Sequence, residues 1–427
     1  MSEMLEVIFT CDNNDHQLTC SAWDFRTGTN LMTYKGGGSA QQHSLCLLRS
    51  EYLLSANNTK PLIHVWPINS QEQITSARFV TPGKPNSLAL SPDGNYLIAG
   101  IQETLYIWHI ATGRMLNTIS KHYQTINCIK FTDDGSHFIS AGQDGGVLVW
   151  NLTQVVARSD DNQTALYSFN DHGLPVTDVY VGCGGIRAYL ITVSLDRTCK
   201  IYDLSSGTLL LNVVFAEGIQ CVVANRLETH VYVGTTEGNI YEFNTDSLPR
   251  TKEYHMEKEH SNKFIGHQGT VLCLGLSLDG QTLISGGQDN KVCIWHILSK
   301  QLVKSLPHKG AVSNIALRLT CPAIFSPEHR QPLVFVNNLK RMIDPPEADV
   351  DEIIEVFVAE QDVDHESDNS KANAYFAHLP TSLRATNTDS TDTSEEISKL
   401  REEVKKLHRI NKNLFEITAK NLMRNKK

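Results

Sequence analysis

The sequence lacks the short motifs on which most catalytic and cofactor sites depend. Its 427 residues contain no GxxxxGK(S/T) phosphate loop, no HExxH zinc-protease motif, no GxSxG hydrolase motif and no EF-hand loop. The glycine-rich run Gly36–Ser39 is not followed by the lysine that a phosphate loop requires. The run Glu253–His260 holds metal-binding residue types, but its polar setting favours a solvated loop. We therefore predict a protein that is not an enzyme and that uses no cofactor and no metal.

Long apolar runs and paired cysteine motifs are also missing. No run reaches the ~18 apolar residues of a membrane-spanning helix, and the N-terminus has no basic segment followed by an apolar one. The ten cysteines form no CxxC pair, and several lie within predicted strands: Cys20, Cys128, Cys199, Cys273 and Cys293. We expect an intracellular protein without membrane contact, in which these cysteines are buried free thiols.

Tryptophan is scarce but regularly placed. The five tryptophans are Trp23, Trp66, Trp108, Trp150 and Trp295, and the first four are 43, 42 and 42 residues apart. This period is that of a four-stranded propeller blade. Between Trp150 and Trp295, Tyr202 and Phe243 end the same kind of short apolar run. Seven aromatic positions therefore predict seven blades.

The local pattern around these aromatics also repeats. INCIKFTDDGSHFISAGQDGGVLVW (126–150) and VLCLGLSLDGQTLISGGQDNKVCIW (271–295) each begin with an alternating strand that leads into Asp-Gly. Asp-Gly favours a tight hairpin turn, and a second strand and a third strand follow it. The pattern predicts an all-β fold of antiparallel hairpins.

These repeats resemble the WD40 family. In that family a histidine, a serine or threonine, an aspartate and the tryptophan form a hydrogen-bonded network within each blade. Three blades match, with the last three members separated by four and then six residues: His122, Ser140, Asp144 and Trp150; His172, Thr192, Asp196 and Tyr202; His267, Ser285, Asp289 and Trp295. The resemblance implies that these residues are structural.

A Ser-His-Asp combination is also found in hydrolase triads. A nucleophilic site needs one exposed serine beside an oxyanion hole, whereas this combination occurs three times. Buried histidine and aspartate are tolerated when they bond to each other, and such a network fixes one arrangement of the blade. We therefore favour the structural role.

The remaining blades are degenerate, and the sixth has no histidine before it. The ends of the repeat region are nevertheless informative. MLEVIFTC (4–11) has the pattern of a second strand, and AVSNIALRL (311–319) has the pattern of an innermost strand. We predict that these two segments pair in the first blade and close a seven-bladed WD40 β-propeller without an open edge.

The predicted domains are the propeller (1–325), an acidic linker (326–394) and a C-terminal helix (395–427). The net charge is −9, and 344–370 alone holds eleven acidic and no basic residues, which leaves about +2 for the rest. The near-neutral body shows no broad nucleic-acid footprint, although direct RNA contact stays open. The linker has too little apolar surface to fold alone and is expected to be largely disordered.

Two parts of the linker allow alternatives. Residues 350–364 set apolar residues among acids, which suits either a solvated spacer or a segment that folds on a partner. Thr386–Ser394 is a Ser/Thr cluster that suits phosphorylation, while Thr393 and Glu396 also form a helix capping box.

The C-terminal helix carries apolar residues at alternating spacings of three and four. This is a coiled-coil seam in which a buried asparagine would fix the register. The seam residues are Ile397, Leu400, Val404, Leu407, Asn411 and Leu414. A helix this short needs a partner. We expect a homodimer through it, with folding back onto the propeller as the alternative.

Several segments resemble the WD-repeat protein 18 family, the propeller subunit of the rixosome. The matching segments are LMTYKGG (31–37), KHYQ (121–124), SHFISAGQD (136–144), DHGLPVTD (171–178), SLDRTCKIYDLSSGTLLLNVVF (194–215) and KLREEVKKLHRINKNLF (399–415). They span the propeller and the terminal helix.

The resemblance implies a non-catalytic scaffold subunit for maturation of the large ribosomal subunit precursor (pre-60S) and removal of internal transcribed spacer 2. The implied partners are an α-helical scaffold rich in Pro, Glu and Leu and a second helical-repeat subunit. A Las-type endonuclease, a SUMO protease and the AAA ATPase midasin would act with the complex. The implied location is the nucleus, nucleolus and nucleoplasm, with some protein in the cytoplasm. Roles in chromatin and replication are a further implication.

One feature favours a different class. Trp23-Asp24-Phe25-Arg26 resembles the WDxR element of WD40 substrate receptors in cullin-RING ubiquitin ligases. A four-residue match arises easily in WD proteins. The alternative is that Arg26 only belongs to the turn before the next strand, and we favour that alternative.

Overall fold

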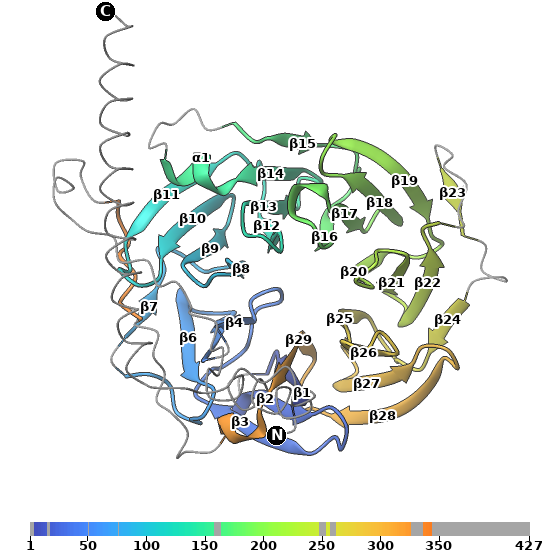
Figure 1. Ribbon diagram of the computed structural model, residues 1–427, viewed down its shortest axis with the longest axis horizontal. Coiled ribbons are helices and arrows are strands. Elements are labelled where there is room, and N and C mark those ends of the chain that lie inside the picture. Colours follow the sequence, from blue (N-terminus) through green and yellow to red (C-terminus); the bar gives the residue numbers. More distant parts are fainter. Residues whose placement is uncertain are drawn as a thin grey trace, which may run out of the picture. The chain divides into compact units, whose positions relative to one another are not determined.

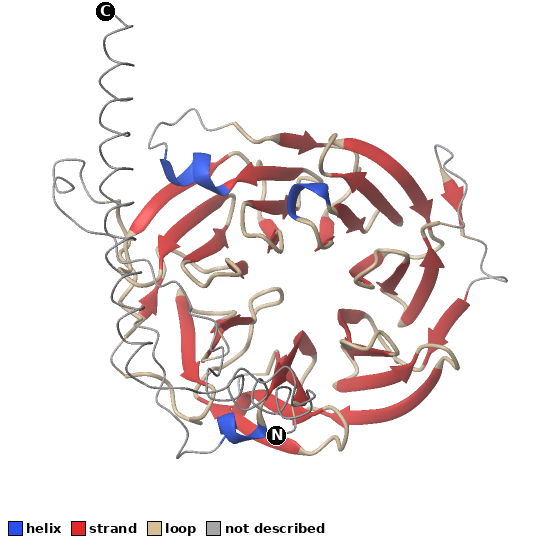
Figure 2. Cartoon of the chain, in the orientation of Figure 1, coloured by secondary structure: helices blue, strands red, loops and turns tan. Residues whose placement is uncertain are grey.

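Seven sheets are arranged around a central channel in the computed structural model (Figure 1). Their strands pair antiparallel, except that Tyr254–His255 pairs parallel with Thr208–Val214. The fold is almost entirely strand (Figure 2). The structure describes residues 4–14, 18–49, 51–75, 77–157, 164–246, 253–256, 262–325 and 336–343. The prediction of an all-β, seven-bladed propeller is confirmed. In the described part of the chain, no helix has the length and apolarity needed to cross a bilayer.

The first three blades contain four strands each. From the channel outward, blade 1 is β29 (Val312–Thr320), β1 (Leu5–Asp12), β2 (Leu18–Asp24) and β3 (Asn30–Lys35). Blade 2 is β4 (Cys46–Leu48), β5 (Tyr52–Ala56), β6 (Leu62–Pro67) and β7 (Phe79–Val80). Blade 3 is β8 (Ser87–Leu90), β9 (Tyr96–Ile101), β10 (Thr104–His109) and β11 (Met115–Ser120).

The other four blades follow the same order. Blade 4 is β12 (Ile126–Phe131), β13 (His137–Gly142), β14 (Val147–Asn151) and β15 (Tyr167–Phe169), with helix α1 (Leu152–Ala157) after β14. Blade 5 is β16 (Val176–Val181), β17 (Tyr189–Ser194), β18 (Thr198–Asp203) and β19 (Thr208–Val214), extended by β23 (Tyr254–His255). Blade 6 is β20 (Ile219–Ala224), β21 (His230–Thr235), β22 (Asn239–Asn244) and β24 (Asn262–Ile265). Blade 7 is β25 (Val271–Leu276), β26 (Thr282–Gly287), β27 (Lys291–His296) and β28 (Gln301–Pro307). The 3-10 turns are Gly185–Arg187 and Pro322–Phe325.

The ring closes by pairing the two ends of the repeat region. Strand β29 pairs antiparallel with β1, from Leu5 opposite Thr320 to Asp12 opposite Val312. The predicted closure is therefore confirmed. Its physical effect is that the backbone groups of β1 are paired on both sides, so the first blade presents no open edge at the seam.

Apolar packing between successive blades forms the core. Trp66, Trp108, Trp150 and Trp295 are fully buried. The core cluster around Trp150 also contains Ile98 and Leu105 of blade 3, so one cluster joins two neighbouring sheets. The Asp-Gly turns behave as expected, because their glycines take positive φ angles: 74° at Gly94, 70° at Gly135 and 66° at Gly280.

One expectation about the cysteines is wrong. Cys11 and Cys20 face each other across β1 and β2, and a disulfide links them. Their Cα atoms are 4.3 Å apart, as directly opposed residues in an antiparallel pair can be. Cys20 is therefore not a free thiol. The free cysteines of the described residues include Cys128, Cys199, Cys273 and Cys293, as expected.

Candidate functional site

The blade 4 network brings together all four residues that the sequence pattern selected. His122 lies between Asp144 and Ser140, with Nδ1 3.2 Å from Asp144 Oδ2 and Nε2 2.8 Å from Ser140 Oγ. Trp150 donates its indole N–H to the same Ser140 oxygen at 3.0 Å. Asp144 also accepts a bond from the backbone N–H of Tyr123 at 2.9 Å. The network thus ties the loop before the blade to its second and third strands.

Blade 7 repeats this geometry. His267 Nδ1 lies 3.0 Å from Asp289 Oδ1, and its Nε2 lies 2.7 Å from Ser285 Oγ. Trp295 Nε1 donates to Ser285 Oγ at 2.7 Å. The two networks lie in separate blades and have the same connectivity, as a repeated structural device would.

Blade 5 keeps the two hydrogen bonds of the histidine, but its aromatic residue bonds to a different acceptor. His172 bonds to Asp196 at 3.0 Å and to Thr192 at 2.8 Å. Tyr202, which takes the tryptophan position, donates its hydroxyl to Asp171 Oδ2 at 2.9 Å. A phenol reaches farther than an indole N–H, so the aspartate beside the histidine becomes its acceptor.

Burial makes these networks unsuitable for hydrolysis. Ser140, Thr192 and Ser285 have no exposed surface, so no substrate reaches their hydroxyl groups. Burial lowers the pKa of His122, although Asp144 acts in the opposite direction. Burial raises the pKa of Asp196, but hydrogen bonds from His172 and Thr198 outweigh it and hold the pKa below its usual range. In each set, the histidine links an aspartate to a buried hydroxyl group on the second strand of the blade.

Blade 6 contains a network that the sequence pattern missed. Glu217 replaces the absent histidine and accepts bonds from Thr235 Oγ1 at 2.7 Å, Asn239 Nδ2 at 3.1 Å and Tyr241 OH at 2.9 Å. The aromatic member is Tyr241 and not Phe243. The sequence pattern did not reveal this network because Glu217 has a different position relative to its blade. It lies two residues before β20, whereas His122 lies four residues before β12.

Blade 1 has an incomplete network. Trp23 donates to Thr10 Oγ1 at 3.0 Å, and the His308 ring packs against the Trp23 ring with centroids 5.5 Å apart. His308 lies four residues before β29, the same offset that His267 has to β25. This shared offset could have identified His308 as a network residue from the sequence. Burial lowers the pKa of His308 to about 4.

A segment that follows the last propeller strand in sequence docks against blade 3. The indole N–H of Trp108 donates to the carbonyl oxygen of Lys340 at 2.8 Å, and the Lys340 N–H donates to Gly113 O at 2.7 Å. Asn338 Oδ1 accepts a bond from the Arg78 N–H at 2.6 Å, which adds blade 2 to the contact. Residues 336–343 lie inside the range expected to be linker, yet they pack on the propeller.

Apolar burial and close backbone contact reinforce this docking. Leu339 is 6% exposed and belongs to the core cluster that contains Trp108 and Met115. Gly113 has φ 69°, and a Cβ there would lie 2.1 Å from Asn338 O, so only glycine fits beneath the segment. Ile343 forms a parallel bridge with Met115. The chain therefore leaves the described structure at the outer rim of blades 2 and 3.

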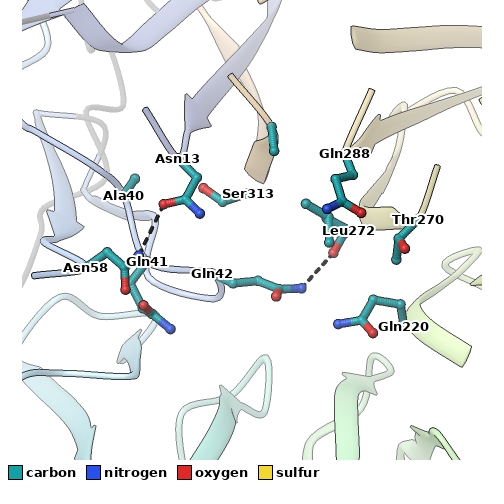
Figure 3. A pocket seen from close by; sticks show the side chains of 11 residues that line it. Asn13, Ala40, Gln41, Gln42, Asn58, Gln220, Thr270, Leu272, Gln288 and Ser313 are labelled. Atoms are coloured by element: carbon teal, nitrogen blue, oxygen red, sulfur yellow. Dashed lines mark hydrogen bonds between the residues drawn. The ribbon is translucent and has the colours of Figure 1, made fainter. Parts of the chain in front are cut away.

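One mouth of the central channel holds a hollow of about 400 Å³. Figure 3 shows uncharged amide side chains around it, and Asn58 Nδ2 donates to Asn13 Oδ1 at 3.2 Å. Gln42 extends across the mouth and donates to Leu272 O at 2.9 Å (Figure 3). The lining residues are Asn13, Ala40, Gln41, Gln42, Asn58, Gln220, Thr270, Leu272, Gln288, Ala311 and Ser313. Amides both donate and accept hydrogen bonds, so this mouth suits a polar, uncharged ligand group.

Two further predictions concern Arg26 and the seam residues of the C-terminal helix. Arg26 is exposed in the turn after β2, where its N–H donates to Asp24 Oδ1 at 2.9 Å. The Asp24 carboxylate thus organises this turn, and the WDxR element stays a prediction. The seam residues Ile397, Leu400, Val404, Leu407, Asn411 and Leu414 lie outside the described residues, as does 344–394.

Comparison with known proteins identifies the family. The model of the WD domain, G-beta repeat, matches residues 113–151 and 258–296. WD repeat-containing protein 18 of Danio rerio is 34% identical over 428 residues, which cover 98% of both chains. The Rattus norvegicus protein of that name is 38% identical over 336 residues, or 78% of each chain.

The chain belongs to the WD repeat-containing protein 18 family. A more distant relative is the pre-rRNA-processing protein pro-1 of Caenorhabditis elegans, 25% identical over 352 residues, which cover 80% of this chain and 66% of that protein. Membership of the WD repeat-containing protein 18 family agrees with the resemblance seen in the sequence segments. WD40 propellers generally serve as non-catalytic scaffolds, and the buried blade networks suit that role.

Proposed function

We propose that this chain is a non-catalytic scaffold subunit in the processing of precursor ribosomal RNA. The observation that carries the proposal is the similarity to WD repeat-containing protein 18 over 98% of both chains. The distant relative pro-1 is named for pre-rRNA processing. A closed propeller with buried polar networks supplies rigid surfaces for partners.

The proposal extends to a specific assembly. The chain binds a helical scaffold rich in Pro, Glu and Leu together with a second helical-repeat subunit, and it acts on pre-60S particles in the nucleolus and nucleoplasm. Midasin, a Las-type endonuclease and a SUMO protease join through that complex. Two copies associate through the seam Ile397–Leu414. The support for these details is the resemblance of the propeller and terminal segments to the family.

The experiment is affinity purification of the tagged full chain from nuclear extract beside a 1–394 truncation, with mass spectrometry of the partners. We expect the helical scaffold, midasin and large-subunit precursors with the full chain. The truncation removes the predicted seam but retains the docked segment 336–343, so it tests the helix separately. Light scattering of both chains at micromolar concentration then reports the dimer.

Two results would contradict the proposal. Recovery of a cullin adaptor in place of ribosome-assembly proteins would move the chain to the ubiquitin class, and loss of that adaptor in Arg26→Ala would establish it. Recovery of neither group would leave the scaffold without ribosomal partners and refute the proposed function. A matched control is Arg318→Ala, which removes another exposed arginine, on strand β29.

A further inference from the structure

The innermost strands of four consecutive blades share one irregularity. Each has a shift of register just before its third residue: between Ile126 and Cys128, Val176 and Asp178, Ile219 and Cys221, and Val271 and Cys273. A bulge re-aims the side chain beside it. Cys128, Asp178, Cys221 and Cys273 therefore occupy equivalent places around the channel, and three of the four are cysteines.

Two of the three thiols at these places make the same contact with the next blade, and the third does not. Cys221 Sγ lies 3.4 Å from Val271 O, and Cys273 Sγ lies 3.5 Å from Val312 O, so each thiol donates to the next blade. Cys128 Sγ instead lies 3.5 Å from the side-chain oxygen Oδ1 of Asp178. A buried carboxylate in this ring is costly without a positive partner.

A histidine from another part of the chain completes the cluster. His43 lies in the loop between blades 1 and 2, and its Nδ1 is 3.6 Å from Asp178 Oδ1. In the part of the chain that the structure describes, the ligand atoms of His43, Cys128 and Asp178 all lie within 4.8 Å of one another. Their side chains are buried or nearly so, with 12% of His43 and 10% of Asp178 exposed.

The loop that carries His43 is held in place from both sides. His43 has φ 53°, a left-handed conformation that is uncommon outside glycine and asparagine. Gln42 bonds to Leu272 O at 2.9 Å, and the Ser44 N–H bonds to Asn314 Oδ1 at 3.2 Å. Strained backbone of this kind persists where the surroundings fix it and gathers at binding sites.

We propose that His43, Cys128 and Asp178 bind one Zn²⁺ ion that joins blades 4 and 5 to the loop at the channel. Zinc bonds of about 2.0–2.3 Å place tetrahedral ligand atoms roughly 3.3–3.6 Å apart. Asp178 Oδ1 lies 3.5 Å from Cys128 Sγ and 3.6 Å from His43 Nδ1, and the ligand atoms of His43 and Cys128 lie within 4.8 Å of each other. A thiolate and a carboxylate balance the two charges of the ion. The fourth position is left for water or a partner's donor.

The carboxylate is oriented as a metal ligand requires. Asp178 Oδ1 accepts a bond from the Val179 N–H at 2.8 Å, and Oδ2 accepts one from the Val222 N–H at 3.1 Å. Such outer bonds fix the position of a ligand. Zinc binds cysteine as the thiolate, so the ion must displace the thiol proton of Cys128, and binding weakens as the pH falls.

The same strand offers a competing cation. Lys130 lies on β12. Desolvation lowers the pKa of its ammonium group, but Cys128 and Asp178 raise it by more, so the pKa is above its usual value. If its ammonium is the counter-ion of Asp178, the site does not need a metal. The experiment therefore has to separate zinc binding from a salt-linked cluster.

The test uses the full chain, loaded with Zn²⁺, dialysed and analysed by mass spectrometry of the metal. We expect about one tightly held ion per chain and a higher melting temperature than that of the chelator-treated protein. His43→Ala and Asp178→Asn should lose the ion, whereas Cys221→Ser and Cys273→Ser, at equivalent places in the ring, should retain it. Replacement by Co²⁺ should give a thiolate-to-cobalt absorption band that Cys128→Ser lacks.

Three outcomes would overturn the proposal. In the first outcome, the wild-type chain retains no ion and shows no shift in melting temperature, which is expected if Lys130 neutralises Asp178. In the second outcome, the variants His43→Ala and Asp178→Asn retain the ion, which would show that the ion binds elsewhere in the chain. A cobalt band that persists in Cys128→Ser would likewise exclude this thiol. The cobalt spectrum of the wild-type chain keeps the test valid even if one variant fails to fold.

Discussion

Trp108 donates its indole N–H to the carbonyl oxygen of Lys340, 232 residues farther along the chain. Trp150 and Trp295 bond to a serine of their own blade, but blade 3 takes its acceptor from the docked segment 336–343. A degenerate blade is thus completed by residues from outside the repeats. The same contact fixes where the chain leaves the propeller.

Leu339→Ala should destabilise the protein by about 2–4 kcal/mol, because it empties a buried site in the core of blades 2 and 3. Met342→Ala is the matched control in the same segment, since Met342 is 81% exposed and should change stability by less than about 0.5 kcal/mol. Urea unfolding measures both. Equal effects of the two variants would show that the segment does not dock.

Fragments that end at different residues test the closure of the ring. Fragment 1–309 lacks β29 and leaves one edge of β1 unpaired, so we expect it to aggregate or unfold without a cooperative transition. Fragment 1–325 keeps β29 and should fold, and fragment 1–343 should be more stable because it adds the docked segment. Circular dichroism during heating ranks the three. A soluble, cooperatively folding 1–309 would refute the importance of the closure.

Asp144→Ala should lower the free energy of unfolding by roughly 2–4 kcal/mol, since it leaves Nδ1 of buried His122 without its carboxylate partner. Asp246→Ala, in the exposed turn after β22, is the control and should have little effect. Thermal unfolding measures both variants. An unchanged melting temperature together with lost partner binding would contradict the structural role of Asp144.

Glu217→Gln should cost about 1–3 kcal/mol, because one acceptor oxygen becomes an N–H₂ group that faces the donors Thr235, Asn239 and Tyr241. Glu103→Gln changes an exposed glutamate and serves as the control. Denaturant unfolding of the two variants gives the difference. Similar stabilities would mean that blade 6 does not depend on its network.

Acidification should destabilise the protein before its carboxylates titrate. The pKa of His308 is about 4 in the folded protein and about 6.5 in an unfolded chain, so the unfolded chain binds the proton first. The stabilisation is complete above about pH 6.5 and is lost as the pH falls toward 4, by at most ~1.4 kcal/mol per pH unit from this group. Burial lowers the pKa of other histidines in the same direction: His43, His64, His109, His122 and His137.

The variant His308→Gln isolates this contribution. It should flatten the dependence of the unfolding free energy on pH between 6.5 and 4, whatever its effect at neutral pH. His255→Asn, in which an exposed imidazole is replaced, should leave the slope unchanged. Equal slopes in His308→Gln and the wild-type chain would exclude His308 as a source of the pH dependence.

The sequence by itself determined the blade count, the hairpin turns, the closure and three polar networks. These features depend on local spacing, because a strand, a turn and a tryptophan recur at fixed offsets within one blade. The His308 offset was equally local and available. The blade 6 network escaped because a glutamate at a different offset performs the histidine's task.

Only the tertiary structure decided which distant residues meet. Lys340 reaches Trp108, and His43 lies beside Cys128 and Asp178, which are on strands of different blades. No sequence period links such positions, since their separation is set by how the ring closes and where loops cross the channel. A repeat pattern fixes what each blade contains, whereas contacts between blades and across the channel follow from packing in three dimensions.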